Sequence, residues 1–456
     1  MDAETIVAIS TGAGPAAIGV VRMTGPGVAD CLSRHCRTPD GRRIEFQSRA
    51  REQVLCDLID DDTDVIDRAL VTFFPGPHSY TGEDVAEFSL HGNPILLRAF
   101  VDAVLHGASG RIRPARPGEF TKRAYLNGHL DLSQAEAVHR MVTARSRFEL
   151  EAGRKNLFGE ISRLTSRFRS ALIHLKAETE AEVDFSTEDL TFNTLAERKE
   201  QVRALVQKLD ELLRRARETE RISTGFQVAL VGVPNAGKSS LLNRILGWER
   251  AIVSPIAGTT RDYVTEEILF DGVPVRFVDT AGIRDTADVI EEQGVRMSLE
   301  LIRKSDLVLH LIDASRPPVA FPSGLERASQ LVHLINKIDI DERTAYYEAR
   351  YPGERFLGIS CLTGAGLTEF RSLLGEYMRR EDVGGEPLLL EARQKHHLEN
   401  VRQALLRALE LLEQNAPQEI VAIEIDGALE QTGELTGRID SEEILGRIFS
   451  VFCVGK

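Results

Sequence analysis

One stretch of this chain constrains its fold more than any other, the glycine-rich segment from Gly232 to Ser239. It reads Gly-Val-Pro-Asn-Ala-Gly-Lys-Ser, the pattern GxxxxGK[ST], between the apolar run Phe226–Val231 and the helical pattern Ser240–Leu246. In this strand–loop–helix setting, backbone N–H groups at a helix N-terminus point at phosphate oxygens. The segment therefore predicts an α/β domain that binds a nucleoside triphosphate. Lys238 would reach the β- and γ-phosphates, and Ser239 would hold Mg²⁺.

Three more motifs follow, each after an apolar run that predicts a strand: Asp279-Thr280-Ala281-Gly282 after Val275–Val278, Asn336-Lys337-Ile338-Asp339 after Leu331–Ile335, and Ser360-Cys361 after Phe356–Ile359. A carboxylate at Asp279 would lie near the metal, and Gly282 lets backbone approach the γ-phosphate. Asp339 can accept hydrogen bonds from two guanine N–H donors, which adenine cannot supply. Over residues 222–381 the motifs resemble those of the translation-factor-like GTPases. The candidate nucleotide-binding residues are Asn235, Ala236, Gly237, Lys238, Ser239, Ser240, Asp279, Thr280, Ala281, Gly282, Asn336, Lys337, Asp339, Ser360 and Cys361.

The residues expected to act in hydrolysis depart from the Ras pattern. Ile283 follows the second motif, where Ras-type switches carry a Gln, and an aliphatic side chain cannot orient water. Residues 254–262, Ser-Pro-Ile-Ala-Gly-Thr-Thr-Arg-Asp, lie where the first switch belongs, and Thr260 can ligate Mg²⁺ when GTP is bound. Hydrolysis is therefore expected to use other groups.

Other segments surround this α/β region. Residues 1–118 predict a mixed α/β unit with a helix over 94–105 and strands at Ile6–Ile9, Ile18–Met23, Ala69–Phe74 and Val85–Leu90. Residues 119–221 and 382–456 are helical in pattern, with long amphipathic segments at 144–182 and 194–218. These patterns predict an α/β plus α protein. Because the termini of a domain often lie close together, one domain can be inserted into another. We expect a Ras-like P-loop GTPase domain, 222–381, to interrupt a helical bundle domain.

Two short signals refine this expectation. Ser133 and Glu136 have the spacing of a capping box and predict a helix that begins at Ser133. Asp271-Gly272 lies between two apolar runs and predicts a hairpin turn, which suits the one antiparallel edge of this GTPase fold.

Composition limits where the chain acts and what it binds. Its 456 residues carry a net charge of −14, no run of about 20 apolar residues that could span a membrane, and no secretory signal. Five cysteines without a CxxC pair argue against disulfides or a structural zinc site and favour the cytoplasm. Residues 111–176 hold fourteen Lys or Arg and six Asp or Glu. This local excess is either a solvated helical face or a surface that meets phosphate.

Further motifs lie outside the GTPase segment: Tyr80-Thr-Gly-Glu-Asp84, Ala115-Arg-Pro-Gly-Glu-Phe-Thr121, Asn127-Gly-His-Leu-Asp-Leu-Ser-Gln-Ala-Glu136, Leu445-Gly-Arg-Ile-Phe449 and the terminal Cys453-Val-Gly-Lys456. With them, the sequence is similar essentially end to end to the MnmE (TrmE) family of tRNA modification GTPases. The resemblance implies a cytoplasmic homodimer that forms a heterotetramer with a flavin-dependent partner, MnmG. Together they add an aminomethyl-type group to C5 of the wobble uridine of certain tRNAs.

The resemblance also implies cofactors. They are GTP, Mg²⁺, K⁺ and a tetrahydrofolate derivative, the 5,10-methylene form, with the formyl form as an analogue. The N-terminal domain, 1–118, would bind the folate and form the homodimer. The flavin belongs to the partner, since this chain has no FAD fingerprint.

Site residues are carried over by motif position. The potassium ligands would be Asn235, Ser254, Ile256 and Thr259, the catalytic residues Glu291 and Cys453, and the folate contacts Arg22, Glu87, His129 and Lys456. His129 stands where the family has Lys, and a His is shorter and largely neutral at pH 7. Cys361 stands where the family has Ala.

Two questions stay open at this stage. As a thiol near the chain end, Cys453 could attack C6 of the uridine or assist the partner. Two other functions share the four GTPase motifs: a regulatory GTPase of ribosome assembly, and a nucleotide-dependent structural protein. The regulatory GTPase has no need of the features at 80–136 and 441–456, which favour the modification enzyme over it.

Overall fold

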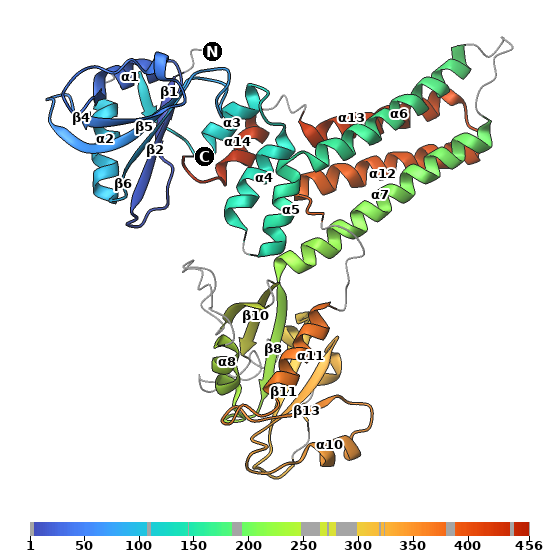
Figure 1. The fold of residues 1–456 in the computed structure, drawn as a ribbon. Coiled ribbons are helices and arrows are strands. Elements are labelled where there is room, and N and C mark those ends of the chain that lie inside the picture. Colours follow the sequence, from blue (N-terminus) through green and yellow to red (C-terminus); the bar gives the residue numbers. More distant parts are fainter. Residues whose placement is uncertain are drawn as a thin grey trace, which may run out of the picture. The chain divides into compact units, whose positions relative to one another are not determined.

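The computed structural model describes residues 4–106, 111–144, 146–184, 194–247, 265–270, 273–279, 299–318, 321–322, 324–379, 388–437 and 442–455. The chain divides into two compact units (Figure 1). Unit 1 comprises Met1–Thr143, Gly153–Leu209 and Glu391–Lys456, and unit 2 comprises Ala144–Ala152 and Asp210–Leu390. The chain therefore enters unit 2 twice, briefly over Ala144–Ala152 and then over Asp210–Leu390, and the long second passage is what an inserted segment should give.

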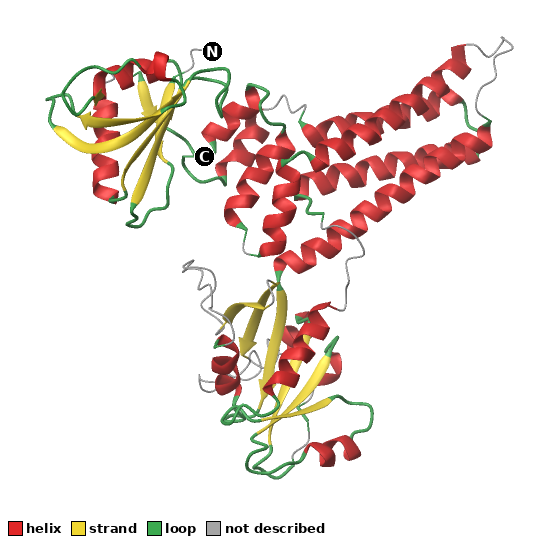
Figure 2. Cartoon of the chain, viewed as in Figure 1, coloured by secondary structure: helices red, strands yellow, loops and turns green. Residues whose placement is uncertain are grey.

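Unit 1 begins with a seven-stranded sheet in the order β3-β4-β5-β6-β2-β1-β7, one of the two sheets drawn in Figure 2. Its elements are β1 Thr5–Ile9, β2 Ile18–Thr24, α1 Val28–His35, β3 Cys36–Arg37, η1 Phe46–Arg49, β4 Gln53–Ile59, β5 Val65–Phe74, β6 Val85–His91, α2 Pro94–His106 and β7 Ile112–Pro114. Only the β1–β7 pair is parallel. Helix α2 buries Leu97, Phe100 and Val104, and the Phe100 ring lies 4.9 Å from that of Phe88 on β6.

The four predicted strands and the predicted helix of this region are present as β1, β2, β5, β6 and α2. The sequence analysis missed β4, whose buried residues include Val54, Cys56 and Leu58. The alternation in β4 is broken, because Asp57 is buried on the strand and pairs with Arg68 of β5. The missing period of two explains why this strand was not predicted.

The rest of unit 1 is helical, and two of its helices, α5 and α7, continue into unit 2. The helices are α3 Glu119–Leu126, α4 Leu132–Thr143, α5 Arg147–Leu157, α6 Glu160–Asp184, α7 Leu195–Thr224, α12 Ala392–Glu413, α13 Gln418–Thr436 and α14 Glu442–Ser450. Helix α13 packs against both α6 and α12 (Figure 1). The predicted segment 144–182 is two helices, broken at Phe158 and Gly159, where Gly159 has φ +81°.

The predicted capping box at Ser133 and Glu136 is wrong. Helix α4 begins at Leu132, and its capping box lies two residues earlier than predicted: the reciprocal hydrogen bonds join Asp131 and Gln134, at 2.9 and 3.0 Å. Glu136 instead accepts two hydrogen bonds from the Arg393 guanidinium and one from Gln394 of α12. A buried carboxylate needs such partners, so this tertiary ion pair outweighs the local cap.

Unit 2 contains a six-stranded sheet in the order β13-β12-β11-β8-β10-β9, in which only β9 is antiparallel. Its elements are β8 Phe226–Gly232, α8 Lys238–Leu246, β9 Thr265–Phe270, β10 Val273–Asp279, β11 Leu307–Asp313, η3 Leu325–Arg327, β12 Leu331–Asn336, α10 Thr344–Arg350, β13 Phe356–Ile359 and α11 Leu367–Arg379. The predicted antiparallel edge is present as the β9–β10 pair, although Asp271 and Gly272 lie outside the described residues. Strand β11 is buried at every position, as a parallel strand covered on both faces should be.

Among the helices that the structure describes, none is long and apolar enough to cross a membrane.

Candidate functional site

The loop between β8 and α8 carries the first predicted motif. Strand β8 pairs in parallel with β10 on one side and β11 on the other, so its carboxyl end lies at the point where the strand order reverses. Ligands of open α/β sheets bind at such points. Asn235, Gly237 and Gly232 have φ of +66°, +101° and +157°, and Asn235, Ser239 and Ser240 are exposed. The loop thus presents its backbone and two hydroxyl groups to a ligand.

Lys238 begins helix α8, and its side chain is buried against this loop. The ammonium group donates to the carbonyl oxygens of Gly232 at 2.8 Å and Val233 at 3.1 Å. These carbonyls hold a positive charge over the loop, beside the N-terminus of α8. The arrangement suits an anionic ligand.

Asn336, the last residue of β12, joins three of the four motifs. Its amide nitrogen donates to the Ala236 carbonyl at 2.9 Å, and its amide oxygen accepts from the Cys361 backbone N–H at 3.1 Å. A Cβ atom at residue 237 would lie 2.1 Å from the same amide nitrogen, so only glycine fits there. The sequence placed Asn336 in the site but did not predict that it ties the phosphate loop to the base-binding loop.

The predicted base-binding residues also meet. The buried Ser360 hydroxyl donates to the Asp339 carboxylate and accepts from the Thr363 backbone N–H. Burial raises the pKa of the neighbouring Cys361 thiol to about 11, so this cysteine stays a neutral packing residue. The Ser360 hydroxyl thus holds one oxygen of the Asp339 carboxylate in place, and the carboxylate can still accept hydrogen bonds from a base.

Two residues missed by the sequence analysis support this region. Arg244 of α8 donates to the carbonyls of Cys361 at 2.8 Å and Leu362 at 2.6 Å, which fixes the loop after β13. Asp313, at the end of β11, accepts from the Lys337 ammonium at 2.6 Å. Although burial opposes it, hydrogen bonds from Lys337 and Ser315 hold the pKa of Asp313 below its usual value. Asp313 could have been predicted, because a carboxylate stands directly after an apolar run. No sequence pattern pointed to Arg244.

Several predicted residues lie outside the described residues. They are Ser254, Ile256, Thr259, Thr260, Thr280, Ala281, Gly282, Glu291 and Lys456. Asp279 ends strand β10, in register with Leu230 of β8, so its backbone lies next to the strand that leads into the phosphate loop.

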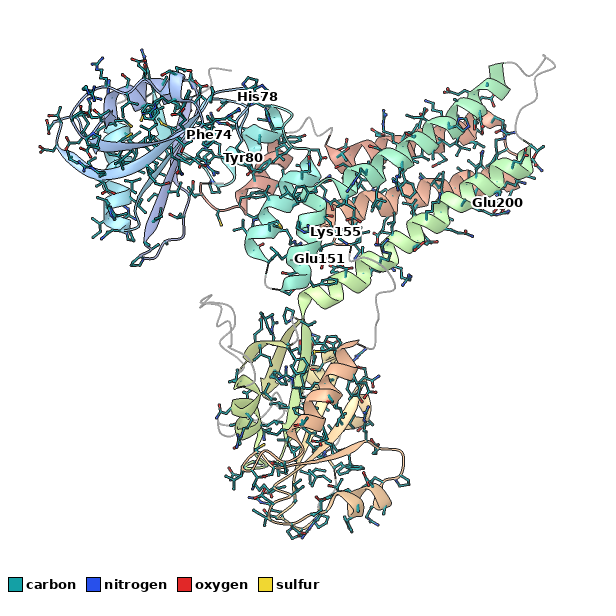
Figure 3. All side chains as sticks on the ribbon, in the orientation of Figure 1. Phe74, His78, Tyr80, Glu151, Lys155 and Glu200 are labelled. Atoms are coloured by element: carbon teal, nitrogen blue, oxygen red, sulfur yellow. The ribbon has the colours of Figure 1, made fainter. Side chains whose placement is uncertain are left out.

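Two of the predicted folate contacts, Arg22 and Glu87, lie on the sheet of unit 1. Arg22 of β2 lies opposite Glu87 of β6 in the strand register, and their side chains are joined at 2.6 Å. The Arg22 guanidinium also lies 5.5 Å from the ring centre of Tyr80, labelled in Figure 3, and 5.9 Å from that of Phe120. Both charged side chains are partly exposed. The pair is therefore a cation and an anion at an aromatic-lined surface.

His129 and the C-terminal segment lie in the same unit. A Cβ atom on Gly82 would come within 2.8 Å of the His129 ring, so the imidazole packs on the loop that carries Tyr80. The C-terminal segment contacts the residue after β1 and the residue before α3: Ser10 donates to the Gly455 carbonyl at 3.0 Å, and the Gly118 N–H donates to the Cys453 carbonyl at 3.3 Å. Cys453 itself is exposed.

Comparison with known proteins agrees with this organisation. Residues 132–453 match the family described as "MnmE helical domain", and residues 5–129 match "GTP-binding protein TrmE N-terminus". The chain belongs to the MnmE family. The tRNA modification GTPase MnmE of Leptospira biflexa is 43% identical and covers 99% of this chain and 100% of its own length. That of Akkermansia muciniphila is 40% identical, with 99% of each chain covered.

Among solved structures, the G domain of the T. maritima FeoB iron transporter matches 33% of this chain and 98% of its own. It is 25% identical with a TM-score of 0.26, and this match adds nothing to the assignment. Membership of the MnmE family confirms the predicted fold class, an N-terminal α/β domain and a helical domain with an inserted GTPase segment. It also confirms the predicted enzyme class, a GTPase.

Proposed function

We propose that this chain hydrolyses GTP to drive modification of the wobble uridine of tRNA at C5. In this proposal an aminomethyl-type group is added, a tetrahydrofolate derivative supplies the one-carbon unit, and a flavin-dependent partner, MnmG, supplies redox chemistry. The division of labour follows the predicted domains: 1–118 for folate and dimerisation, 119–221 and 382–456 for the helical scaffold, and 222–381 for GTP. Its tRNA substrate and its free cysteines favour the cytoplasm.

The observation that carries the proposal is the corner of unit 1 where Arg22, Glu87 and the C-terminal segment meet the sheet. Arg22 and Glu87 offer a guanidinium and a carboxylate side by side, which can pair with a ligand carboxylate and with ring N–H donors. The Gly118–Cys453 and Ser10–Gly455 hydrogen bonds tie the terminal cysteine segment to the residue before α3 and to the residue directly after β1 of this sheet. A GTPase with a purely regulatory role has no need of this corner.

The nucleotide site fits GTP and Mg²⁺ through the features already described. Gly237 tolerates no side chain, Lys238 places a cation over the loop, and the exposed Ser239 hydroxyl is free to meet a metal. When bound, Mg²⁺ would neutralise charge on the β- and γ-phosphates. Asp339, held by Ser360, would select guanine.

Potassium is proposed as the element that replaces a catalytic arginine. The Asn235 side chain is exposed on the loop, and its amide oxygen suits a hard cation. With Ser254, Ile256 and Thr259 it would form the cation site, and Glu291 would position water. A fixed positive charge between the β- and γ-phosphates contributes several kcal/mol to such reactions.

Analysis of wobble uridines in tRNA from cells lacking this protein tests the proposal. We expect the C5-modified nucleoside to disappear and to return with the wild-type gene. A normal tRNA profile together with a ribosome-assembly defect would instead favour the regulatory GTPase, and a normal profile with neither defect would favour a structural role.

A further inference from the structure

The outer surface of helices α5 and α6 in unit 1 concentrates positive charge. Between Arg154 and Arg169 the sequence has five cationic residues, Lys155 among them (Figure 3), and one carboxylate, Glu160. The whole chain carries a net charge of −14, so this stretch opposes the overall charge. We call the surface formed by Arg154, Phe158, Arg163 and Arg167 the α5–α6 basic face.

Helical geometry explains how this face forms. Helix α6 buries Ile161, Thr165, Phe168, Leu172 and Leu175, at helical spacing, on the side that packs against α13. Arg163 and Arg167, four residues apart, fall on the opposite side and are exposed. Arg169 is exposed too, but it follows Arg167 by two residues and so lies on the other flank of the helix, outside the basic face. The buried apolar residues and the exposed Arg163 and Arg167 thus occupy opposite sides of one amphipathic helix. These two arginines therefore face away from the helical core.

These arginines have no carboxylate partner among the described residues. Elsewhere in the basic segment, four cations are paired with carboxylates: Arg113 with Glu119, Arg123 with Glu83, Arg140 with Glu391 and Lys176 with Asp426. On the basic face, by contrast, the Arg163 guanidinium contacts only the Gly159 carbonyl, at 3.3 Å. Four cations of residues 111–176 are therefore neutralised by carboxylates, whereas the arginines of the basic face are not.

An exposed aromatic side chain lies within this face. Phe158 is 70% exposed at the corner between α5 and α6, next to Gly159 in the left-handed region. It follows Arg154 by one helical turn and precedes Arg163 by five residues. Proteins that bind single-stranded or looped RNA combine cations for the phosphates with aromatic rings for the bases.

We propose that the α5–α6 basic face binds tRNA. In this proposal, which rests on the proposed function, Arg154, Arg163 and Arg167 contact the phosphate backbone, and Phe158 stacks on an unpaired base. An acidic protein surface would match the charge and could also bury a phenyl ring, but a tRNA offers both phosphates and unpaired bases and is the proposed substrate of this chain. This combination therefore favours RNA as the occupant.

Binding of a fluorescent, unmodified tRNA transcript to the full chain, measured by anisotropy over a range of salt concentrations, tests this assignment. We expect R163E/R167E to weaken binding at 100 mM salt at least about ten-fold and to reduce the slope of log K against log salt by about two. F158A should weaken binding about five-fold or more with no change in that slope. The matched control is R34E/R98E, an equal charge change on exposed residues of α1 and α2, which should alter binding less than about two-fold.

The GTPase rate without tRNA, equal in all variants, checks that each is folded. If R163E/R167E binds tRNA as tightly as R34E/R98E, the basic face is not the RNA surface, and wobble-uridine analysis still judges the proposed function separately. The same conclusion holds if R163E/R167E loses binding to the MnmG partner and keeps binding to tRNA, because the face would then meet a protein. If the wild-type chain binds no tRNA at any salt concentration, the proposal also fails.

Discussion

At the scale of single residues, a few side chains join motifs that are far apart in the sequence. Asn336 bonds both the phosphate loop and the loop after β13, and Ser360 orients Asp339. Each motif was readable from the sequence because its residue types and strand ends suffice to identify it. The hydrogen bonds between the motifs could not be predicted, because they depend on which strand ends are neighbours in the sheet.

Replacing Asp339 with Asn tests the guanine preference. The change turns one oxygen acceptor into a donor, which repels the guanine N–H groups and matches the carbonyl of xanthine. We expect D339N to lower kcat/KM for GTP by at least about 100-fold and to raise it for xanthosine triphosphate. D341N is the matched control, since Asp341 pairs with Arg343 two residues beyond the motif, and it should behave as wild type. Equal hydrolysis of ATP and GTP by the wild-type chain would contradict the assignment.

Replacing Arg22 with Ala tests the folate site. Loss of a charge-assisted hydrogen bond costs about 1.5–3 kcal/mol, so calorimetry should give a folate affinity lowered by about ten-fold or more. R68A removes an arginine paired with Asp57 on the same sheet and should leave folate affinity unchanged. An unchanged affinity in R22A would show that the folate binds elsewhere.

At the scale of elements, strands β11 and β12 are joined by a buried histidine pair. The Nδ1 atoms of His310 and His333 lie 2.9 Å apart, so one ring donates to the other only while at least one is neutral. Phe321 packs on both rings, and Glu354 lies 3.5 Å from the other nitrogen of His333. Burial, with the charge of His333 as a smaller cause, lowers the pKa of His310 to about 3. Unit 2 therefore contains a built-in sensitivity to acid.

The sign of this effect is fixed by linkage. A histidine whose pKa is lower in the folded state contributes its full stability above its unfolded pKa, near 6.5, and loses it as the pH falls toward about 3. Between pH 6.5 and 4 the loss in unfolding free energy should be up to about 3 kcal/mol. H310Q should flatten this dependence in urea titrations, whereas H174Q, an exposed histidine of α6, should not. An equally steep dependence in H310Q would exclude the pair as its source.

Elements with a clear period were predictable, and those shaped by distant partners were not. Strands β8, β12 and β13 and helix α2 lie within a residue or two of their predicted ranges. Strand β4 was missed because the buried Asp57 breaks its alternation, and the start of α4 was misplaced because Glu136 binds Arg393 and not its own helix end. In both cases a buried carboxylate pairs with an arginine on another element, and a local sequence pattern cannot predict such a pair.

At the scale of the whole molecule, the chain combines a GTPase unit with a unit that carries the candidate folate and cysteine residues. The chain passes between the units at four points, since Ala144–Ala152 and Asp210–Leu390 belong to unit 2 and the chain returns to unit 1 for the last time at Glu391. Glu391 caps helix α12 and pairs with Arg140 of α4, so the return point is anchored in the helical part of unit 1. A change of state in the GTPase unit would reach unit 1 through these connections.

Potassium dependence is the first prediction at this scale. We expect GTP hydrolysis to be much faster in potassium than in sodium at equal ionic strength, because Asn235 and the loop 254–259 would hold a cation at the phosphates. N235A should remove the difference, and E291A should abolish turnover while GTP binding persists. The control S48A, on the exposed η1 of unit 1, should keep the potassium effect. Identical wild-type rates in the two salts would refute the cation site.

The central claim is that GTP hydrolysis by this chain drives tRNA modification, and a reconstituted reaction tests it most directly. The purified chain, MnmG, a methylene-tetrahydrofolate, potassium and unmodified tRNA are incubated with GTP or with a non-hydrolysable analogue, and the wobble nucleoside is measured by mass spectrometry. We predict that the C5-modified uridine forms with GTP and not with the analogue or with D339N. Equal product with GTP and with the analogue would contradict the account.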